Sequence, residues 1–362
     1  MRVVIAGGGT AGHVQPAVAL ARALASEEVS FIGTATGAEA RLVPDAQLPF
    51  NTIDIRGFDR ARPLSLLSLA PRAARATLQA RSVLRERMPD VVVGMGGYVS
   101  LPVCAAAHLR GTSIVLHEQN AVLGLANRVC KPFATRVAVS WEETLPSAGA
   151  RGVFTGNPVV PEIAHLDRNK RRSAALARFE LEPGRRTLLV FGGSQGARSL
   201  NQAAVGLSER WKDRRDRQVL HIAGPGEFGL FKERVVSGGD LIYRIVDLLS
   251  EMMDAYSVAD LVLCRGGATT VAELTATGLP AIIVPYPFHR DRQQERHAQV
   301  LEAAGAAVTL RDTDTSAASV GDIADSLFDS GGVLASMTQA SLGLGHPQAA
   351  QHLASVVLKA AA

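Results

Sequence analysis

A glycine-rich segment near the start of the chain has the residue types of a phosphate site. It reads GGGTAGH at residues 7–13 and stands between an apolar run at residues 2–6 and a helical pattern at residues 16–25. Glycine lets the backbone approach a ligand closely. The start of a helix presents free N–H groups and the positive end of the helix dipole to an anion. The segment therefore predicts a phosphate-binding turn between a strand and a helix.

The spacing of Gly7, Gly9 and Gly12 also matches the dinucleotide-binding fingerprint G-x-G-x-x-G. That fingerprint has an acidic residue at the end of the second strand, about 20 residues further on, which holds a ribose. Here the second apolar run ends at Gly33 and Thr34, and no acidic residue follows directly. The sequence therefore argues against a dehydrogenase.

A second glycine-rich turn, GGSQG at residues 192–196, follows another apolar run. It matches the G-x-S-x-G elbow of hydrolases, and Asp260 with His289 or His297 could supply the rest of a triad. The elbow explains neither the first glycine segment nor the repeated pattern of the two halves. We therefore favour phosphate binding by Ser194 and nearby N–H groups. Neither turn ends in G-K-S or G-K-T, so a P-loop nucleoside triphosphatase is not expected.

Two more glycine turns, GMGGY at residues 94–98 and GGATT at residues 266–270, also follow apolar runs. The second of them leads into a helical pattern that contains Glu273. A single turn of this kind is an ordinary strand-to-helix connection. Four in one chain indicate a ligand, because open α/β sheets bind ligands beyond the carboxyl ends of their strands.

Short apolar runs alternate with helical patterns in both halves of the chain. They lie at residues 2–6, 29–33, 91–93, 113–116 and 136–139, and again at residues 187–191, 218–223, 242–246, 261–264 and 281–284. This alternation is typical of parallel sheets covered on both faces. The 362 residues fit two domains. Residues 151–172 have the composition of a connection between them.

The excess of positive charge lies in the first half. Residues 1–160 contain 16 Lys and Arg against 11 Asp and Glu, whereas the remainder contains 22 against 23. This asymmetry indicates an anionic partner such as a membrane surface or a phosphate. We expect no nucleic acid, because no recognised binding module is present. We also expect no export signal, no membrane-spanning helix and no disulfide framework or zinc cluster from the three widely spaced cysteines.

Residues 56–87 combine eight arginines with Asp59, Glu86 and several leucines. One interpretation is a basic, apolar patch that sits on anionic lipid. The other is a loop and a solvated amphipathic helix whose leucines pack in the core. The residues of the candidate patch are Arg60, Arg62, Leu64, Leu66, Leu67, Arg72 and Arg75.

Seven segments, taken together, carry a family resemblance. They read GGTAGHV at 8–14, GMGGYVS at 94–100, HEQN at 117–120, GNPV at 156–159, GGSQGAR at 192–198, RGGATTVAE at 265–273 and DRQQ at 291–294. In this order they resemble the MurG family, glycosyltransferase family 28. The resemblance agrees with the repeated halves and implies an α/β chain with the GT-B fold, in which two Rossmann-like, doubly wound parallel-sheet domains face a cleft.

The resemblance implies an inverting transfer of N-acetylglucosamine (GlcNAc) from UDP-GlcNAc to the 4-hydroxyl of the muramyl sugar of lipid I, an undecaprenyl-diphosphate-linked muramyl peptide. The product would be lipid II of peptidoglycan biosynthesis. No cofactor and no obligatory metal are implied. The expected location is the cytoplasmic face of the cell membrane, as a peripheral protein, which favours the lipid interpretation of the patch. Alternatives are another GT-B enzyme such as a lipid glycosyltransferase, a UDP-GlcNAc epimerase, or a non-catalytic binder of nucleotide sugars.

The resemblance also implies roles for segments of the chain. Residues 1–160 would form the domain that binds the lipid acceptor and residues 161–340 the domain that binds UDP-GlcNAc, while residues 341–362 would form a C-terminal helix that packs back on the first domain. His13 resembles the family's candidate general base, since imidazole titrates near neutral pH. The open alternative is that His13 caps the helix or binds a phosphate of the acceptor.

Glu273 resembles the ligand of the donor's ribose, because a carboxylate accepts two bonds from a vicinal diol. The other residues implied to contact UDP-GlcNAc are Thr10, Ala11, Gly12, Asn120, Ser194, Leu249, Ala268, Thr269, Thr270, Val271, Ala272, Gln293 and Gln294. Two positions depart from the family pattern. Ala11 replaces a usual glycine, which requires a negative φ, and Val160 replaces a usual arginine, so we expect no such donor contact there.

Overall fold

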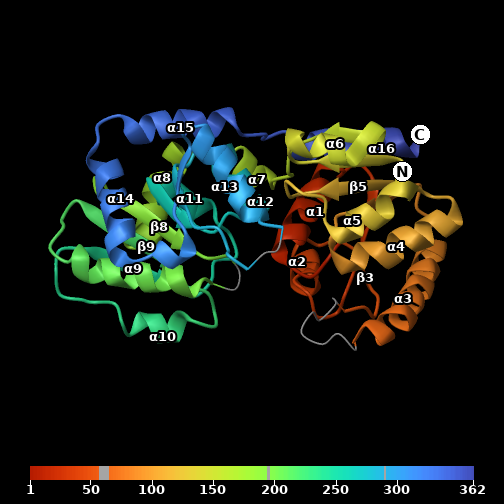
Figure 1. The fold of residues 1–362 in the computed structure, drawn as a ribbon, viewed down its shortest axis with the longest axis horizontal. Helices are drawn as coiled ribbons and strands as arrows, with labels where there is room; N and C mark the ends of the chain where they lie inside the picture. The colour runs from red at the N-terminus through yellow and green to blue at the C-terminus, as the bar shows by residue number, and fades with distance from the viewer. Residues whose placement is uncertain (57–64, 194–195, 289–290) are drawn as a thin grey trace. The chain divides into compact units, whose positions relative to one another are not determined.

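The computed structural model describes residues 1–56, 65–193, 196–288 and 291–362, and for residues 65–70 it describes the backbone only. The chain forms two compact units (Figure 1). The first comprises Met1–Val160 and Pro347–Ala362, and the second comprises Pro161–His346. Each unit is built on a parallel β-sheet, which confirms the predicted α/β fold of two Rossmann-like domains. Within the described ranges, no helix has the length and apolar character needed to cross a membrane.

The sheet of the first unit has seven parallel strands in the order β3-β2-β1-β4-β5-β6-β7. Its strands are β1 (Arg2–Ala6), β2 (Glu28–Gly33), β3 (Phe50–Thr52), β4 (Val91–Gly94), β5 (Ser113–Glu118), β6 (Arg136–Val139) and β7 (Gly152–Phe154). On β1, Ile5 is paired with Phe31 of β2 on one side and with Val93 of β4 on the other. The strand order reverses between β1 and β4, which is the point where sheets of this type bind ligands.

The helices of the first unit cover both faces of its sheet. They are α1 (Ala11–Ala23), α2 (Glu39–Asp45), α3 (Ser65–Arg87), α4 (Gly97–Arg110), α5 (Leu125–Cys130), α6 (Leu145–Ala148) and α16 (Ala349–Ala361), with short 3₁₀ turns η1 (Lys131–Phe133), η2 (Glu142–Thr144) and η3 (Gly149–Arg151). Successive residues of β1 point to opposite faces, so Val4 packs with α3 and α4, whereas Val3 and Ile5 pack with α1 and α16.

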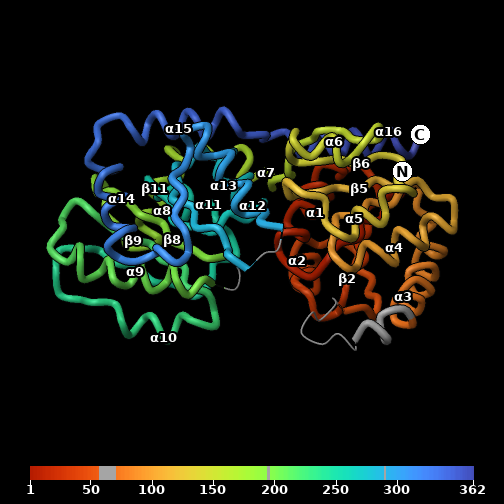
Figure 2. The backbone as a smooth tube through the Cα atoms, viewed as in Figure 1, coloured from red at the N-terminus to blue at the C-terminus, as the bar shows by residue number. Residues whose placement is uncertain are grey.

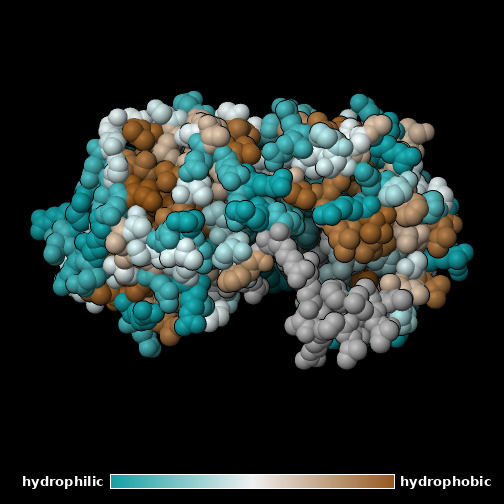
Figure 3. Space-filling model, in the orientation of Figure 1, coloured by the Kyte–Doolittle hydropathy of each residue, from teal (hydrophilic) through white to brown (hydrophobic). Residues whose placement is uncertain are grey.

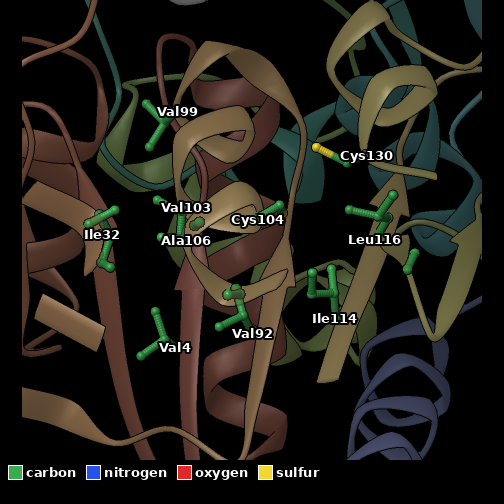
Figure 4. Close-up of a cluster of buried hydrophobic side chains, with 14 of the residues drawn as sticks. Val4, Ile32, Val92, Val99, Val103, Cys104, Ala106, Ile114, Leu116 and Cys130 are labelled. Carbon is green, nitrogen blue, oxygen red and sulfur yellow. The ribbon is translucent and has the colours of Figure 1, made fainter. Parts of the chain in front are cut away.

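Figure 4 shows the first of these two cores, where Val103 and Cys104 of α4 lie among Val4, Val92 and Leu116 of the strands. The second core is completed from the end of the chain. Figure 2 shows the chain returning to the first unit as α16, whose Leu353 and Val357 pack with residues of α1. Both faces of the sheet are therefore buried, which explains the continuous apolar runs of its strands.

The second unit has a six-stranded parallel sheet in the order β10-β9-β8-β11-β12-β13. Its strands are β8 (Arg186–Phe191), β9 (Arg217–Ile222), β10 (Ile242–Val246), β11 (Leu261–Cys264), β12 (Ala281–Ile283) and β13 (Ala307–Thr309). Val190 of β8 is paired with His221 of β9 and Leu263 of β11. The order reverses between β8 and β11, so this sheet has its own switch point.

The helices of the second unit are α7 (Pro161–Ala164), α8 (Arg168–Arg178), α9 (Arg198–Arg210), α10 (Phe228–Lys232), α11 (Met253–Val258), α12 (Ala268–Thr277), α13 (Gln293–Ala303), α14 (Ala317–Asp329) and α15 (Val333–Gly343), with the turn η4 (Asp312–Asp314). Leu200 of α9 and Val320 of α14 belong to one buried cluster with Val190. The capping box of Ser316 and Ser319 fixes the start of α14.

The structure differs from the sequence-based expectations at several boundaries. Helix α1 begins at Ala11 and contains Pro16, whereas the pattern predicts a helix from residue 16; buried neighbours such as Val14 and Leu20 stabilise it despite the missing proline donor. Residues 151–172 contain β7, α7 and the start of α8 in addition to the connection. Because Ala11 is helical and is not among the residues with positive φ, its methyl group fits the loop without backbone strain.

Candidate functional site

The loops that follow β1 and β4 meet at the switch point of the first unit. Ala6 is paired with Gly94 at the ends of these strands, and Met95 N–H donates to Ala6 O over 2.8 Å. Gly97 has a φ of 74°, and a Cβ there would lie 2.7 Å from the carbonyl oxygen of Gly8. Only glycine allows this approach of two backbones, so the glycines at 94–97 serve a packing purpose in addition to any ligand contact.

The first glycine loop is fixed by Glu39, a residue that the sequence does not single out. The buried Glu39 carboxylate accepts hydrogen bonds from Gly9 N (2.9 Å), Thr34 N (3.0 Å) and Thr34 Oγ1 (2.6 Å). The Gly9 N–H is therefore engaged inside the protein. The phosphate-binding capacity of the loop is consequently smaller than the glycine pattern alone suggests.

His13 lies in the first turn of α1 and is half-buried. Its Nδ1 lies 3.1 Å from Oε1 of Gln119, which follows β5. Thr10, which precedes α1, is exposed, and Ala11 and Gly12 are half-buried. Because the described hydrogen bond of the His13 ring runs to Gln119, the helix-capping alternative gains no support.

Asn120, the residue after Gln119, is held in place by hydrogen bonds within the loop after β5. The buried Glu118 carboxylate accepts from Asn120 N (3.1 Å) and from Asn120 Nδ2 (3.0 Å), and it also accepts from Gly124 N and Asn127 Nδ2, both at 2.8 Å. Four donors converge on one carboxylate, so the HEQN segment is rigid. The structure thus brings His13, Gln119 and Asn120 together at one end of the first sheet.

In the second unit, the half-buried Glu273 forms a hydrogen-bonded pair with the buried Tyr256. Tyr256 Oη donates to Glu273 Oε2 over 2.6 Å from α11 to α12. Desolvation raises the pKa of Glu273 to about 7, and the hydrogen bond from Tyr256 opposes that rise. Burial also raises the pKa of Tyr256 well above its usual range and that of Cys264 to about 12, so both of these neighbours stay neutral.

Gln293 and Gln294 are the first residues of α13, and Gln294 lies against the loop before α12. A Cβ on Gly266 would lie 2.8 Å from the carbonyl oxygen of Gln294, and His297 Nδ1 lies 2.9 Å from the carbonyl oxygen of Gly266. Gln294 Oε1 accepts from Tyr286 N over 2.9 Å, and Gln293 bonds to Asp291. The structure therefore brings Gln294 to the loop that starts α12, with Gln293 as its neighbour in the chain.

The structure gives less support to the remaining candidates for the donor site. Ala268 and Val271 of α12 are buried, so they could meet a ligand through their backbone, whereas Thr269, Thr270 and Ala272 are half-buried. Leu249 is half-buried in the loop after the edge strand β10, and none of the contacts described for this chain joins it to Glu273. Ser194 lies outside the described residues, as do His289 and the patch residues Arg60, Arg62 and Leu64.

An exposed apolar surface lies on α4, α5 and η1 of the first unit. Figure 3 shows hydrophobic residues gathered on the face where Figure 1 draws α4 and α5. Leu109 is 67% exposed, Leu125 71%, Val129 49% and Phe133 44%. Basic residues in the same or adjoining segments are the exposed Arg110, Arg128, Arg136 and Arg151 and the half-buried Lys131. On the neighbouring α3, Arg72 and Arg75 are exposed, while the side chains of Leu66 and Leu67 are not described. Exposed apolar side chains combined with basic ones are typical of a surface that contacts anionic membranes.

A separate open cavity of about 670 Å³ lies among α7, α8 and α11 of the second unit. Its charged lining includes Arg171 and Arg178, which both pair with Asp254. None of the predicted site residues lines it. We therefore do not assign it to the candidate site.

Comparison with known proteins places both units in one family. Residues 3–139 match the glycosyltransferase family 28 N-terminal domain, and residues 187–353 match the glycosyltransferase family 28 C-terminal domain. Two relatives have the same name. The one from Halothermothrix orenii is 37% identical over 99% of this chain and 98% of its own length. The one from Frankia casuarinae is 42% identical over 99% of this chain and 96% of its own length. That name is UDP-N-acetylglucosamine–N-acetylmuramyl-(pentapeptide) pyrophosphoryl-undecaprenol N-acetylglucosamine transferase.

Solved structures share the fold over the whole chain. The crystal structure of MurG from Acinetobacter baumannii has a TM-score of 0.77 at 29% identity and covers 99% of both chains. The UDP-GlcNAc 2-epimerase of Neisseria meningitidis, bound to UDP-GlcNAc, has a TM-score of 0.71 at 11% identity, with 99% of this chain and all of the other covered. At that low identity the second likeness concerns the fold alone.

Proposed function

The chain belongs to glycosyltransferase family 28, and from this premise we propose that it transfers GlcNAc from UDP-GlcNAc to N-acetylmuramyl-(pentapeptide) pyrophosphoryl-undecaprenol. The observation that carries the proposal is the full-length identity of 36–42% with relatives named for this reaction. A switch point with polar side chains in each unit is consistent with a reaction between two bound substrates.

The first unit is the proposed acceptor-binding domain, and the second is the proposed donor-binding domain. The excess of basic residues in the first half suits a lipid-linked diphosphate. In the second unit, the first turn of α12 presents backbone N–H groups and the positive end of its dipole to the donor. Tyr256 uses one lone pair of the Glu273 carboxylate, and the others remain for the ribose hydroxyls. Gln293 and Gln294 are the proposed partners of the GlcNAc hydroxyls.

His13 is the proposed general base. The base takes the proton of the acceptor 4-hydroxyl while that oxygen bonds to C1 of GlcNAc, and the bond from C1 to the UDP oxygen breaks on the opposite face. This single displacement inverts the configuration at C1. The negative charge that develops on the departing diphosphate is stabilised by the N–H groups of the donor domain.

The exposed surface of Leu109, Leu125, Val129 and Phe133 is the proposed membrane contact, together with the basic residues of the same segments and with Arg72 and Arg75. The acceptor is anchored in the bilayer by its undecaprenyl chain, so the enzyme has to work at that surface. This assigns the first unit to the membrane face and makes the protein peripheral.

Replacing Leu125 and Phe133 together by serine is expected to lower the partition coefficient onto vesicles of anionic lipid at least about tenfold, because partial burial of the two side chains contributes roughly 1.5 kcal/mol or more. The partition coefficient is measured by sedimentation with sucrose-loaded vesicles. Leu230→Ser, which changes a 51% exposed leucine of the second unit, serves as the matched control. An unchanged partition coefficient for the double variant would rule out this surface.

UDP release tests the proposed reaction. We expect the pure protein to release UDP from UDP-GlcNAc only when an analogue of the muramyl lipid is present. Release without acceptor, or conversion of GlcNAc to its 2-epimer, would contradict the proposal and point to the chemistry of the epimerases that share the fold.

A further inference from the structure

Gln119 lies at the end of β5 with its side chain fully enclosed, since only 1% of the residue is exposed. Three groups surround its amide. Oε1 lies 3.1 Å from His13 Nδ1, and Nε2 lies 2.9 Å from the carbonyl oxygen of Met95 and 3.2 Å from His117 Nδ1. The orientation of this amide is set by which of the surrounding atoms can donate a hydrogen bond and which can only accept one.

The carbonyl oxygen of Met95 can only accept, so the amide atom that faces it must be the NH₂ group of Gln119. This orientation points Oε1 at His13. Because Oε1 also only accepts, Nδ1 of a neutral His13 must carry the proton. The lone pair of the imidazole is then on Nε2.

His117, which lies next to Nε2 of Gln119, supports the same orientation of the amide. Burial lowers its pKa to about 4, so the ring is neutral and its Nδ1 can accept from Gln119 Nε2. Its Nε2 then donates toward the carbonyl oxygen of Gly156 (3.3 Å) and toward Ser140 Oγ (3.3 Å). Ser140 Oγ in turn donates to the carbonyl oxygen of Glu118 over 2.9 Å. Every donor in this chain of contacts has an acceptor, so reversing the amide would break several bonds at once.

The His13 ring is also confined by the loop after β4. A Cβ on Gly96 would lie 3.4 Å from Cε1 and Nδ1 of His13, and a Cβ on Gly97 would lie 3.5 Å from its Cδ2. The ring therefore lies against two glycines, with its Nδ1 at Gln119. The loop and the amide together leave the ring one favourable orientation.

We infer that Gln119 is a positioning residue that holds His13 in the Nδ1–H tautomer and so keeps Nε2 as the proton acceptor for the attacking hydroxyl. The inference rests on the proposed function, in which His13 is the base. The opposite tautomer would present an N–H to the hydroxyl and could not take its proton. Gln119 is neutral, so it selects the tautomer through hydrogen bonding and adds no charge.

The experiment is ¹⁵N NMR of the full-length protein labelled in its nine histidines, because the shifts of Nδ1 and Nε2 distinguish the two tautomers of a neutral ring. The two ring-nitrogen signals that disappear from the spectrum of His13→Ala are those of His13. We expect Nδ1–H in the wild type. In Gln119→Leu we expect the population to move about fivefold to tenfold toward Nε2–H, since one neutral hydrogen bond is lost. We also expect kcat to fall in proportion to the lost Nδ1–H population, by at most that factor, with both KM values nearly unchanged.

Gln218→Leu is the matched control, because Gln218 is another fully buried glutamine whose Nε2 donates to Glu182 O and Thr187 Oγ1 in the second unit. It should leave the His13 tautomer unchanged. A wild-type spectrum with Nε2–H, or an unshifted tautomer in Gln119→Leu, overturns the positioning role, and the wild-type spectrum decides even if a variant fails to fold. A shifted tautomer with unchanged kcat overturns the catalytic consequence. A shifted tautomer in a protein that never releases UDP on addition of acceptor would instead show that the proposed function has failed.

Discussion

Replacing His13 by alanine is expected to lower kcat about 10²- to 10⁴-fold, the range typical of a lost general base. The physical reason is that a sugar hydroxyl is a poor nucleophile until its proton is accepted. The ring sits at the switch point of the first sheet with its Nδ1 at Gln119, which leaves Nε2 for the hydroxyl. Turnover at saturating UDP-GlcNAc and acceptor measures the effect.

The same assay separates the two roles that His13 can have. A phosphate ligand contributes mainly to binding, so its loss would raise the KM for the acceptor and leave kcat nearly normal. A nearly normal kcat would therefore rule out the base. His352→Ala on α16 provides the control, since it removes an exposed histidine of the same unit. Its kcat should equal that of the wild type.

Replacing Glu273 by alanine is expected to raise the KM for UDP-GlcNAc about 10- to 100-fold with a smaller change in kcat. A hydrogen bond to a charged group contributes roughly 1.5–3 kcal/mol, and each 1.4 kcal/mol is about tenfold in affinity. The ribose is remote from the reacting bond, so the contact is expected to be similar in the ground state and the transition state. Initial rates over a range of UDP-GlcNAc concentrations measure it.

The pKa of Glu273 adds a pH dependence to this prediction. Burial raises that pKa to about 7, so the carboxylate that accepts from the ribose is progressively protonated as the pH falls through 7. The KM for UDP-GlcNAc should therefore rise below about pH 7 and level off above it. Tyr256 and Cys264 contribute no charge in this range, because burial raises the pKa of both. Glu273→Gln should give a high KM without this pH dependence.

Glu209→Ala is the control for these measurements, because it removes an exposed helical glutamate of the same unit. It should leave both the KM and its pH profile unchanged. A Glu273→Ala variant with the wild-type KM would show that the ribose contact lies elsewhere.

The inner strands were predictable from the sequence, whereas three edge strands were not. Strands such as β1 and β8 are buried on both faces, so they appear as apolar runs, and β6, β10 and β11 begin and end where the pattern predicts. β3, β7 and β13 have three residues each, lie at sheet edges and are at least partly exposed. The alternation of apolar and polar residues that is typical of a strand cannot be recognised in a segment of three residues.

The candidate site divides in a similar way. Motifs that are local in sequence single out His13, Asn120 and Glu273, and their roles remain proposals. Glu39, Tyr256 and the bond from Gln119 to His13 were not predictable, because they depend on contacts between distant parts of the chain; His13 and Gln119 are 106 residues apart. Likewise, the leucine-rich segment 56–87 suggested a membrane patch, but the exposed apolar residues of α4, α5 and η1 become visible only in the folded chain.

The structure of the reaction product tests the transfer itself most directly. Pure protein would be incubated with UDP-GlcNAc labelled with ¹³C in the sugar and with a soluble analogue of the muramyl lipid, and the product would be analysed by NMR and mass spectrometry. We expect one disaccharide, with the labelled GlcNAc joined through a β-linkage to the 4-position of the muramyl sugar, and UDP in equal amount. Labelled sugar that is free, epimerised, or joined with retained configuration would contradict the proposed inverting transfer.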